Sequence, residues 1–84
     1  MNWFVYIIRA DDDSLYTGIT TNVDRRFNEH LEGPNGARYF NGRKPLEVVY
    51  IEGGHDRSSA SSREYEIKQL SRAQKLGLMA RNAQ

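Results

Sequence analysis

Cysteine is absent from this chain of 84 residues. The sequence therefore offers no disulfide, no thiolate metal ligand and no cysteine nucleophile. A chain without disulfides is compatible with a reducing compartment, and we expect a cytoplasmic location. Long hydrophobic runs are also missing, because the longest extends only from Trp3 to Ile8, whereas a membrane span needs about 20 apolar residues. We expect no membrane segment, and the run lacks the basic flank and cleavage site of a signal peptide.

Motifs for the common cofactors are scarce as well. The two histidines, His30 and His55, lie far apart in the sequence and form no HxxxH pattern, so a zinc site is not expected. Neither GxxxxGK(S/T) nor GxGxxG occurs, which excludes the usual nucleotide-binding loops. Ser14 and the serines that follow Asp56 have no nearby histidine and carboxylate signature, so serine hydrolase chemistry is not favoured.

A large excess of charge of one sign is likewise lacking, because 12 basic and 11 acidic residues leave a net charge of +1. The charges are unevenly distributed, however. Residues 1–56 contain 6 basic and 9 acidic side chains, whereas residues 57–84 contain 6 basic and 2 acidic ones. A basic C-terminal segment can face nucleic-acid phosphates, but the solvated face of a helix explains the same composition.

The apolar pattern predicts one α+β domain that occupies residues 1–84. We expect a small three-stranded antiparallel sheet flanked by helices, in the order β-β-α-β-α-α. The predicted strands are residues 3–10, 14–20 and 46–51. The predicted helices follow the cap Asn22, follow a cap at Asp56 or Ser58, and run over 73–80 after a break near Ser71.

Details of these elements can also be predicted. The first strand is nearly continuously apolar, so we expect both of its faces to be covered. Val23, Phe27 and Leu31 recur every four residues, which predicts that they form the buried stripe of the first helix. Gly53 and Gly54 are expected to end the third strand.

Glu64 is an unusual residue of the second predicted helix. At ~100° per residue it lies about 40° from Ala60 and about 60° from Ile67 around the helix axis, so it faces the buried edge. A carboxylate in such a position must be paired, hydrogen-bonded or bound to a metal ion. The plain alternative is an ion pair with Lys68, one turn further along the helix.

Four other residues form two pairs that are candidates for a functional site. Arg26 and His30 lie one turn apart beside the predicted stripe, where a guanidinium next to an imidazole suits an anionic ligand; a solvated boundary is the alternative. Tyr6 and Tyr16 lie on neighbouring strands, and a tyrosine in an apolar strand is usually a core residue with a satisfied hydroxyl. Two tyrosines on paired strands, with Gly18 after the second, form a more specific pattern.

The order and spacing of these residues strongly resemble the motifs of the GIY-YIG endonuclease family. Val5-Tyr6-Ile7 stands in place of the first motif and Tyr16-Thr17-Gly18 in place of the second. Arg26 lies eight residues after the motif glycine, at the spacing of the family's arginine, and His30 follows four residues later, as in some members. Arg63-Glu64 matches the pair that contains the family's metal-binding glutamate. The chain is most similar to compact single-domain bacterial members, which are similar to the nuclease domain of the structure-specific resolvase of branched DNA.

The resemblance implies hydrolysis of phosphodiester bonds in DNA with one divalent cation, Mg²⁺ or Mn²⁺, held by Glu64. Arg26 is expected to hold the scissile phosphate. Tyr6 is expected to accept the proton of the attacking water, or to orient that water, once neighbouring cations lower the tyrosine pKa. His30 then takes the proton onward or holds the Tyr6 hydroxyl, and Tyr16 hydrogen-bonds phosphate or water.

Contacts with DNA phosphates are expected from four basic residues: Arg38, Arg43, Lys44 and Lys68. Such contacts carry no sequence information, so we expect selection by DNA shape, with a protein partner as a further source of specificity. Two other function classes stay open. One is a non-catalytic nucleic-acid-binding module of the same fold, and the other is a small protein-interaction domain, which only the basic C-terminal helices support.

Overall fold

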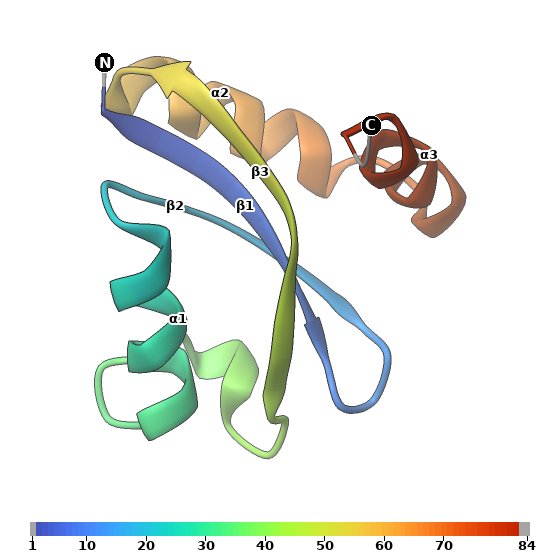
Figure 1. Cartoon of the computed structure of the whole chain (residues 1–84). Helices are drawn as coiled ribbons and strands as arrows, with labels where there is room; N and C mark the ends of the chain where they lie inside the picture. Colours follow the sequence, from blue (N-terminus) through green and yellow to red (C-terminus); the bar gives the residue numbers. More distant parts are fainter. Residues whose placement is uncertain (1, 83–84) are drawn as a thin grey trace.

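The computed structural model of the chain describes residues 2–82 and contains one three-stranded sheet with three α-helices (Figure 1). Its elements are β1 Trp3–Ala10, β2 Leu15–Thr20, α1 Val23–Glu32, the short 3₁₀ helix η1 Arg38–Phe40, β3 Pro45–His55, α2 Arg57–Lys68 and α3 Arg72–Asn82. The strands are antiparallel in the order β2-β1-β3. The predicted α+β class and the order β-β-α-β-α-α are confirmed, and only η1 had no counterpart in the prediction.

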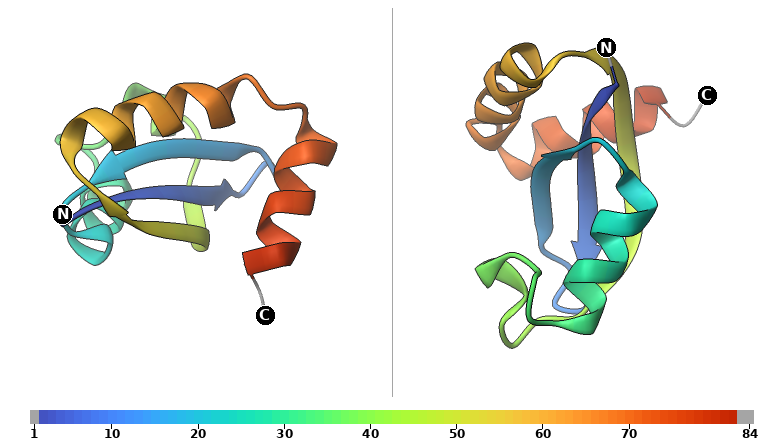
Figure 2. Two further views of the ribbon diagram at one scale, coloured as in Figure 1. Left: turned by 90° about the horizontal axis from the view of Figure 1, so that it is seen from above. Right: turned by 90° about the vertical axis from the view of Figure 1, so that its left-hand side faces the viewer.

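The central strand β1 is buried on both faces, as its continuous apolar sequence predicted. Its alternating side chains contribute to two separate hydrophobic clusters. One cluster contains Val5 and Ile7 of β1 together with Tyr50, Ala60 and Ile67. The other contains Tyr6, Ile8, Ala10 and Phe40. Figure 2 shows the corresponding layers, with α2 along one face of the sheet and α1 on the opposite face.

Strand β3 is longer than predicted, because Gly53 and Gly54 lie within it rather than at its end. Gly54 has a φ of 78°, a conformation that costs glycine little. The pairing of β1 with β3 shifts register between Trp3 and Val5, and Trp3 still pairs with His55. The two glycines therefore mark an irregularity that the strand passes through.

Helix α1 begins after Asn22 as predicted, but it has a different buried face. Its N-terminus is capped by Asn22, whose side chain accepts a hydrogen bond from the Arg25 amide. Leu31 is 44% exposed, whereas His30 is only 3% exposed. The reason is helical geometry, since the seventh residue after Val23 lies about 20° from it around the axis and the eighth about 80°. The prediction of Leu31 in the stripe was wrong, and His30 takes that place.

Helix α2 begins as predicted with Asp56 as its cap. The Asp56 side chain accepts a hydrogen bond from the Ser59 amide, and the Ser59 hydroxyl accepts one from the Asp56 amide. Ala60 and Ile67 are its buried residues, so α2 packs on β1 through the face that the periodicity indicated. No helix within residues 2–82 is long and apolar enough to span a membrane.

Candidate active site

The site is organised around Tyr6, which is 1% exposed at the centre of β1. Tyr6 pairs with Gly18 across the β1–β2 ladder. A Cβ atom added to Gly18 would lie 2.5 Å from the Tyr6 Oη and 2.7 Å from its Cζ. Gly18 is therefore required by packing, because any larger residue would push the phenol out of its place.

Aromatic rings from three other elements gather around this phenol. The ring centroid of His30 on α1 lies 6.1 Å from that of Tyr6 and 5.4 Å from that of Tyr16 on β2. Helix η1 completes the group, because the Phe40 ring lies 4.7 Å from His30 and the Tyr39 ring 5.1 Å from Tyr16. The sequence analysis missed Tyr39 and Phe40; their only signal was two adjacent aromatic residues within a glycine-rich loop.

His30 is held by hydrogen bonds at both ring nitrogens. Its Nε2 lies 2.9 Å from the Tyr6 Oη, and its Nδ1 accepts a hydrogen bond of 3.0 Å from the Ala37 amide. Burial and, to a smaller extent, the Arg26 charge lower the pKa of His30 to about 4, although Glu29 opposes them. His30 is thus a buried, neutral imidazole at pH 7, which excludes the solvated boundary considered for it.

The electrostatics of Tyr6 differ from the expectation. Burial, followed by the neighbouring Tyr16, raises the pKa of the Tyr6 phenol far above its ordinary value, and the Arg26 charge opposes this only in part. Arg26 does lower the Tyr6 pKa, as expected of a nearby cation, but desolvation outweighs it, so the side chains of the protein leave the phenol neutral. A neutral phenol orients water through hydrogen bonds, which favours that role over proton acceptance by a tyrosinate.

Arg26 lies at the edge of the site with a side chain that is partly exposed. Its Nη1 donates hydrogen bonds of 2.9 Å to Glu29 Oε1 and 2.7 Å to the Asn35 carbonyl oxygen. These bonds fix the guanidinium between α1 and the following loop. Because its charge lowers the pKa of both Tyr6 and Tyr16, Arg26 is close enough to act on the same ligand as the tyrosines.

Glu64 approaches the site from α2 and is paired with a cation. Its Oε2 lies 3.3 Å from the Lys68 Nζ, and that ammonium is 5.9 Å from the centroid of the Tyr16 ring. The Glu64 charge raises the pKa of both tyrosines, so the carboxylate lies within electrostatic range of the two phenols. The ion pair considered from the sequence is therefore present, at the edge of the site rather than away from it.

The donor set fits a hard cation that keeps most of its water. Within residues 2–82, no group of three or more histidine, cysteine, aspartate or glutamate side chains is arranged to hold a metal ion. Glu64 is a single carboxylate whose side chain is 24% exposed, as suits Mg²⁺ or Mn²⁺ bound through one protein oxygen, water and substrate phosphate. Such a cation would have to displace the Lys68 ammonium from Glu64.

The other predicted basic residues surround the site unevenly. Arg38 and His30 both line a cavity of about 260 Å³. Arg43 donates a hydrogen bond of 2.7 Å to Asp12 Oδ2, and its guanidinium lies 4.4 Å from the Tyr39 ring centroid. Lys44 is exposed. Arg38 and Lys44 therefore lie open to a ligand, whereas Arg43 is already held by protein groups.

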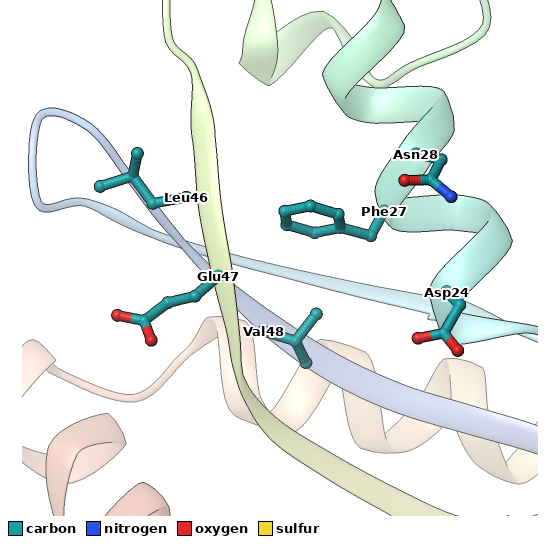
Figure 3. Close-up of a pocket in the computed structure, with 6 residues that line it drawn as sticks. All are labelled: Asp24, Phe27, Asn28, Leu46, Glu47 and Val48. Carbon is teal, nitrogen blue, oxygen red and sulfur yellow. The ribbon is translucent and has the colours of Figure 1, made fainter.

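A larger groove of about 500 Å³ lies between α1 and β3 (Figure 3). Its lining contains none of the residues predicted for the site: Asp24, Phe27, Asn28, Leu46, Glu47 and Val48. Its lining has two carboxylates and no basic side chain, which does not favour a phosphate ligand. The candidate active site is therefore the surface around Tyr6, where the aromatic rings gather, and not this groove.

One side-chain network departs from the sequence analysis, which found no histidine and carboxylate near the serines. His55 Nδ1 lies 2.9 Å from the Ser59 Oγ, and His55 Nε2 lies 2.7 Å from Glu52 Oε2. Arg63 Nε also donates to both Glu52 oxygens at 3.1 Å. Ser59 already belongs to the α2 cap and Glu52 is neutralised by Arg63, so the network ties the end of β3 to α2.

Known proteins resemble this chain over most of its length. The sequence profile of the GIY-YIG catalytic domain matches residues 2–77. A UPF0213 protein of Desulfotalea psychrophila is 54% identical over 77 residues, which are 92% of this chain and 70% of that protein. One from Natronomonas pharaonis is 51% identical over 92% of this chain and 89% of its own. The solution NMR structure of a UPF0213 protein from Bacillus halodurans covers 95% of this chain and 84% of its own at 44% identity, with a TM-score of 0.59.

Proposed function

The chain belongs to the GIY-YIG catalytic domain family, and from that premise we propose that it is a divalent-metal-dependent endonuclease that hydrolyses phosphodiester bonds in DNA. One observation carries the proposal: side chains from four elements converge on one surface with the chemistry that the reaction needs. They are Tyr6, Tyr16, Arg26, His30 and Glu64. A module that only binds nucleic acid needs neither a buried tyrosine–histidine pair nor a carboxylate whose charge acts on the same tyrosines.

In the proposed reaction, the oxygen of a water molecule bonds to the phosphorus and the bond from phosphorus to the 3′ oxygen breaks. The water gives up a proton, and the leaving oxygen gains one to become a 3′ hydroxyl. Arg26 binds the scissile phosphate, and its contact strengthens as negative charge accumulates on the phosphate oxygens. Tyr6 orients the water, and Tyr16 hydrogen-bonds the phosphate or a second water.

Glu64 is the residue that holds the cation in this proposal. The cation, Mg²⁺ or Mn²⁺, supplies stabilisation of negative charge on the phosphate and on the leaving oxygen. Lys68 leaves Glu64 when the cation binds, and its ammonium is then free to contact a DNA phosphate. The same surface thus provides the metal ligand and one of the backbone contacts.

Basic side chains around the site would bind the DNA backbone. Arg38, Lys44 and Lys68 contact the phosphates on either side of the cleaved bond and give affinity without sequence preference. Arg43 joins them by exchanging Asp12 for a phosphate. Selection then rests on the shape of the DNA, of the kind that branched or flapped molecules present, or on a protein partner. We include a cytoplasmic location in the proposal, because DNA is the substrate.

A panel of labelled DNA molecules tests the proposal directly. Single-stranded, duplex, flapped and branched DNAs are incubated with the protein and Mg²⁺ or Mn²⁺, with EDTA in parallel reactions. We expect cation-dependent cleavage, fastest on a branched or flapped molecule, that EDTA abolishes. Binding to every DNA without cleavage at any cation concentration would instead support the non-catalytic nucleic-acid-binding module. Absence of both binding and cleavage would favour a protein-interaction domain.

A further inference from the structure

We propose that the backbone amide of Ala37 fixes His30 as the tautomer with its proton on Nε2, so that His30 donates a hydrogen bond to Tyr6 and cannot take a proton from it. The inference refines the proposed nuclease site and rests on it for its catalytic meaning. Its structural part concerns hydrogen bonds within the protein alone. Ala37 is in this view a positioning residue that acts through His30.

The tautomer follows from the two hydrogen bonds of the imidazole. A backbone amide can only donate, so the nitrogen that receives the Ala37 N–H at 3.0 Å must present its lone pair. That nitrogen is Nδ1, and a neutral imidazole carries a single ring proton, which must then be on Nε2. Since Nε2 is 2.9 Å from the Tyr6 Oη, the ring donates to the phenol oxygen.

The charge state of the ring supports the same assignment. His30 is almost fully buried, and desolvation together with the Arg26 charge keeps its pKa below the ordinary value. A protonated ring would direct an Nδ1–H against the Ala37 N–H, with two donors facing one another. The neutral Nε2–H form is the one that satisfies both partners.

The loop at residues 33–37, which we call the backing loop, is held against α1 at this point. A Cβ atom on Gly36 would lie 2.8 Å from the His30 Cα and 3.0 Å from the Glu29 carbonyl oxygen, so only glycine permits the approach. The carbonyl oxygen of Asn35 accepts the hydrogen bond from Arg26 Nη1 at 2.7 Å. The contact of Ala37 with His30 is therefore built into the packing of the loop.

The consequence concerns the direction of the Tyr6 hydroxyl. Its oxygen uses one lone pair to accept from His30 Nε2–H, and its own proton is left for a substrate group. The Arg26 guanidinium lies at the same oxygen, so the phenol orients the attacking water by donating its own proton. Tyr6 stays neutral, and His30 gains no proton. His30→Ala would disturb the direction of this hydrogen bond without removing a base.

Nuclear magnetic resonance tests the inference without DNA or cation, so its outcome is independent of the proposed nuclease activity. Protein with ¹⁵N in the His30 ring is examined at pH 7 by long-range ¹H–¹⁵N correlation. We expect a proton-bearing Nε2, a bare Nδ1, and a coupling across the hydrogen bond between the Ala37 amide nitrogen and Nδ1. A proton on Nδ1, or a fast mixture of both tautomers, would overturn the inference.

A synthetic chain supplies the matched variant. Replacement of Ala37 by L-lactic acid exchanges the amide N–H for an ester oxygen of similar size and leaves the side chain unchanged. In this variant the ester oxygen and Nδ1 would face each other with lone pairs. We therefore expect the His30 proton to move from Nε2 to Nδ1 in part or fully. The synthetic all-amide chain is the control. A folded ester variant that keeps a pure Nε2–H tautomer would show that Ala37 does not set it. If the ester variant fails to fold, the coupling in the unaltered protein decides.

Discussion

Protonation of His30 should make the folding stability of this protein depend on pH in a window that begins above the usual range of carboxylates and extends down to it. The folded-state pKa of about 4 lies below the ordinary value of 6.5. Between these two pH values the unfolded chain binds a proton that the folded chain does not. The free energy of unfolding therefore falls as the pH falls from 6.5 to 4, and this group has no further effect outside that window.

The magnitude follows from the pKa difference. Each pKa unit corresponds to about 1.4 kcal/mol, so a difference of 6.5 − 4 = 2.5 amounts to about 3 kcal/mol across the window, as an upper limit. A small domain has only about 5–15 kcal/mol of total stability. The loss should thus be large enough to move the urea midpoint clearly. Its physical origin is the burial of His30 and its contact with Ala37, which a charged ring cannot keep.

The assay is urea unfolding of the wild type and of His30→Gln at a series of pH values from 7.5 to 4.5. Glutamine cannot be protonated, so its unfolding free energy should fall less steeply, and the advantage of the wild type should shrink by about 2–3 kcal/mol over the series. Carboxyl groups with lowered pKa, such as Asp12 and Glu52, titrate in both proteins and cancel in the comparison. Parallel pH curves for the two proteins would refute the assignment of His30 as a buried neutral imidazole.

Two substitutions elsewhere test the packing and the ion pair. Gly18→Ala should lower the free energy of unfolding by about 1–3 kcal/mol, because its Cβ would overlap the Tyr6 hydroxyl, and it should also slow cleavage. The control is Gly77→Ala in α3, where nothing lies within 4 Å of the added Cβ. This variant should raise the free energy of unfolding by about 0.5–1 kcal/mol. Equal stability of the two variants would contradict the packing role of Gly18. Lys68→Met should tighten Mn²⁺ binding several-fold in calorimetry, since the competing ammonium of the Glu64 ion pair is gone; an unchanged affinity would show that Lys68 does not compete with the cation.

Much of the fold followed from local patterns. The continuous apolar run of β1 predicted a strand covered on both faces, and caps at Asn22 and Asp56 located two helix starts. The errors arose where the backbone deviates from simple rules. The glycines of β3 produced an irregularity inside the strand instead of ending it. In α1, the spacing of four residues predicted that Leu31 is buried. The buried residue is His30, which lies seven residues, or nearly two turns, after Val23.

Motif spacing predicted Tyr6, Tyr16, Arg26, His30 and Glu64 as a set, and their catalytic roles stay predictions. The interactions among these side chains could not be predicted from the sequence. The raised Tyr6 pKa depends on how completely three dimensions remove water from the phenol. The Ala37 amide is a backbone group and has no sequence signature. Tyr39 and Phe40 joined the site through the fold of η1, which the loop composition did not reveal.

The measurement that tests the central claim most directly is single-turnover cleavage of a branched DNA, with Mg²⁺ or Mn²⁺, by the wild type, Glu64→Ala and Glu66→Ala. Glu66 is the matched control, because it lies on the same helix, is 65% exposed and pairs with Arg63. The account predicts that Glu64→Ala folds normally yet cleaves about 10²-fold more slowly or worse, whereas Glu66→Ala keeps the wild-type rate. Cleavage by folded Glu64→Ala at the wild-type rate, or an equal loss in both variants, would contradict the assignment of Glu64 as the metal ligand of a nuclease site.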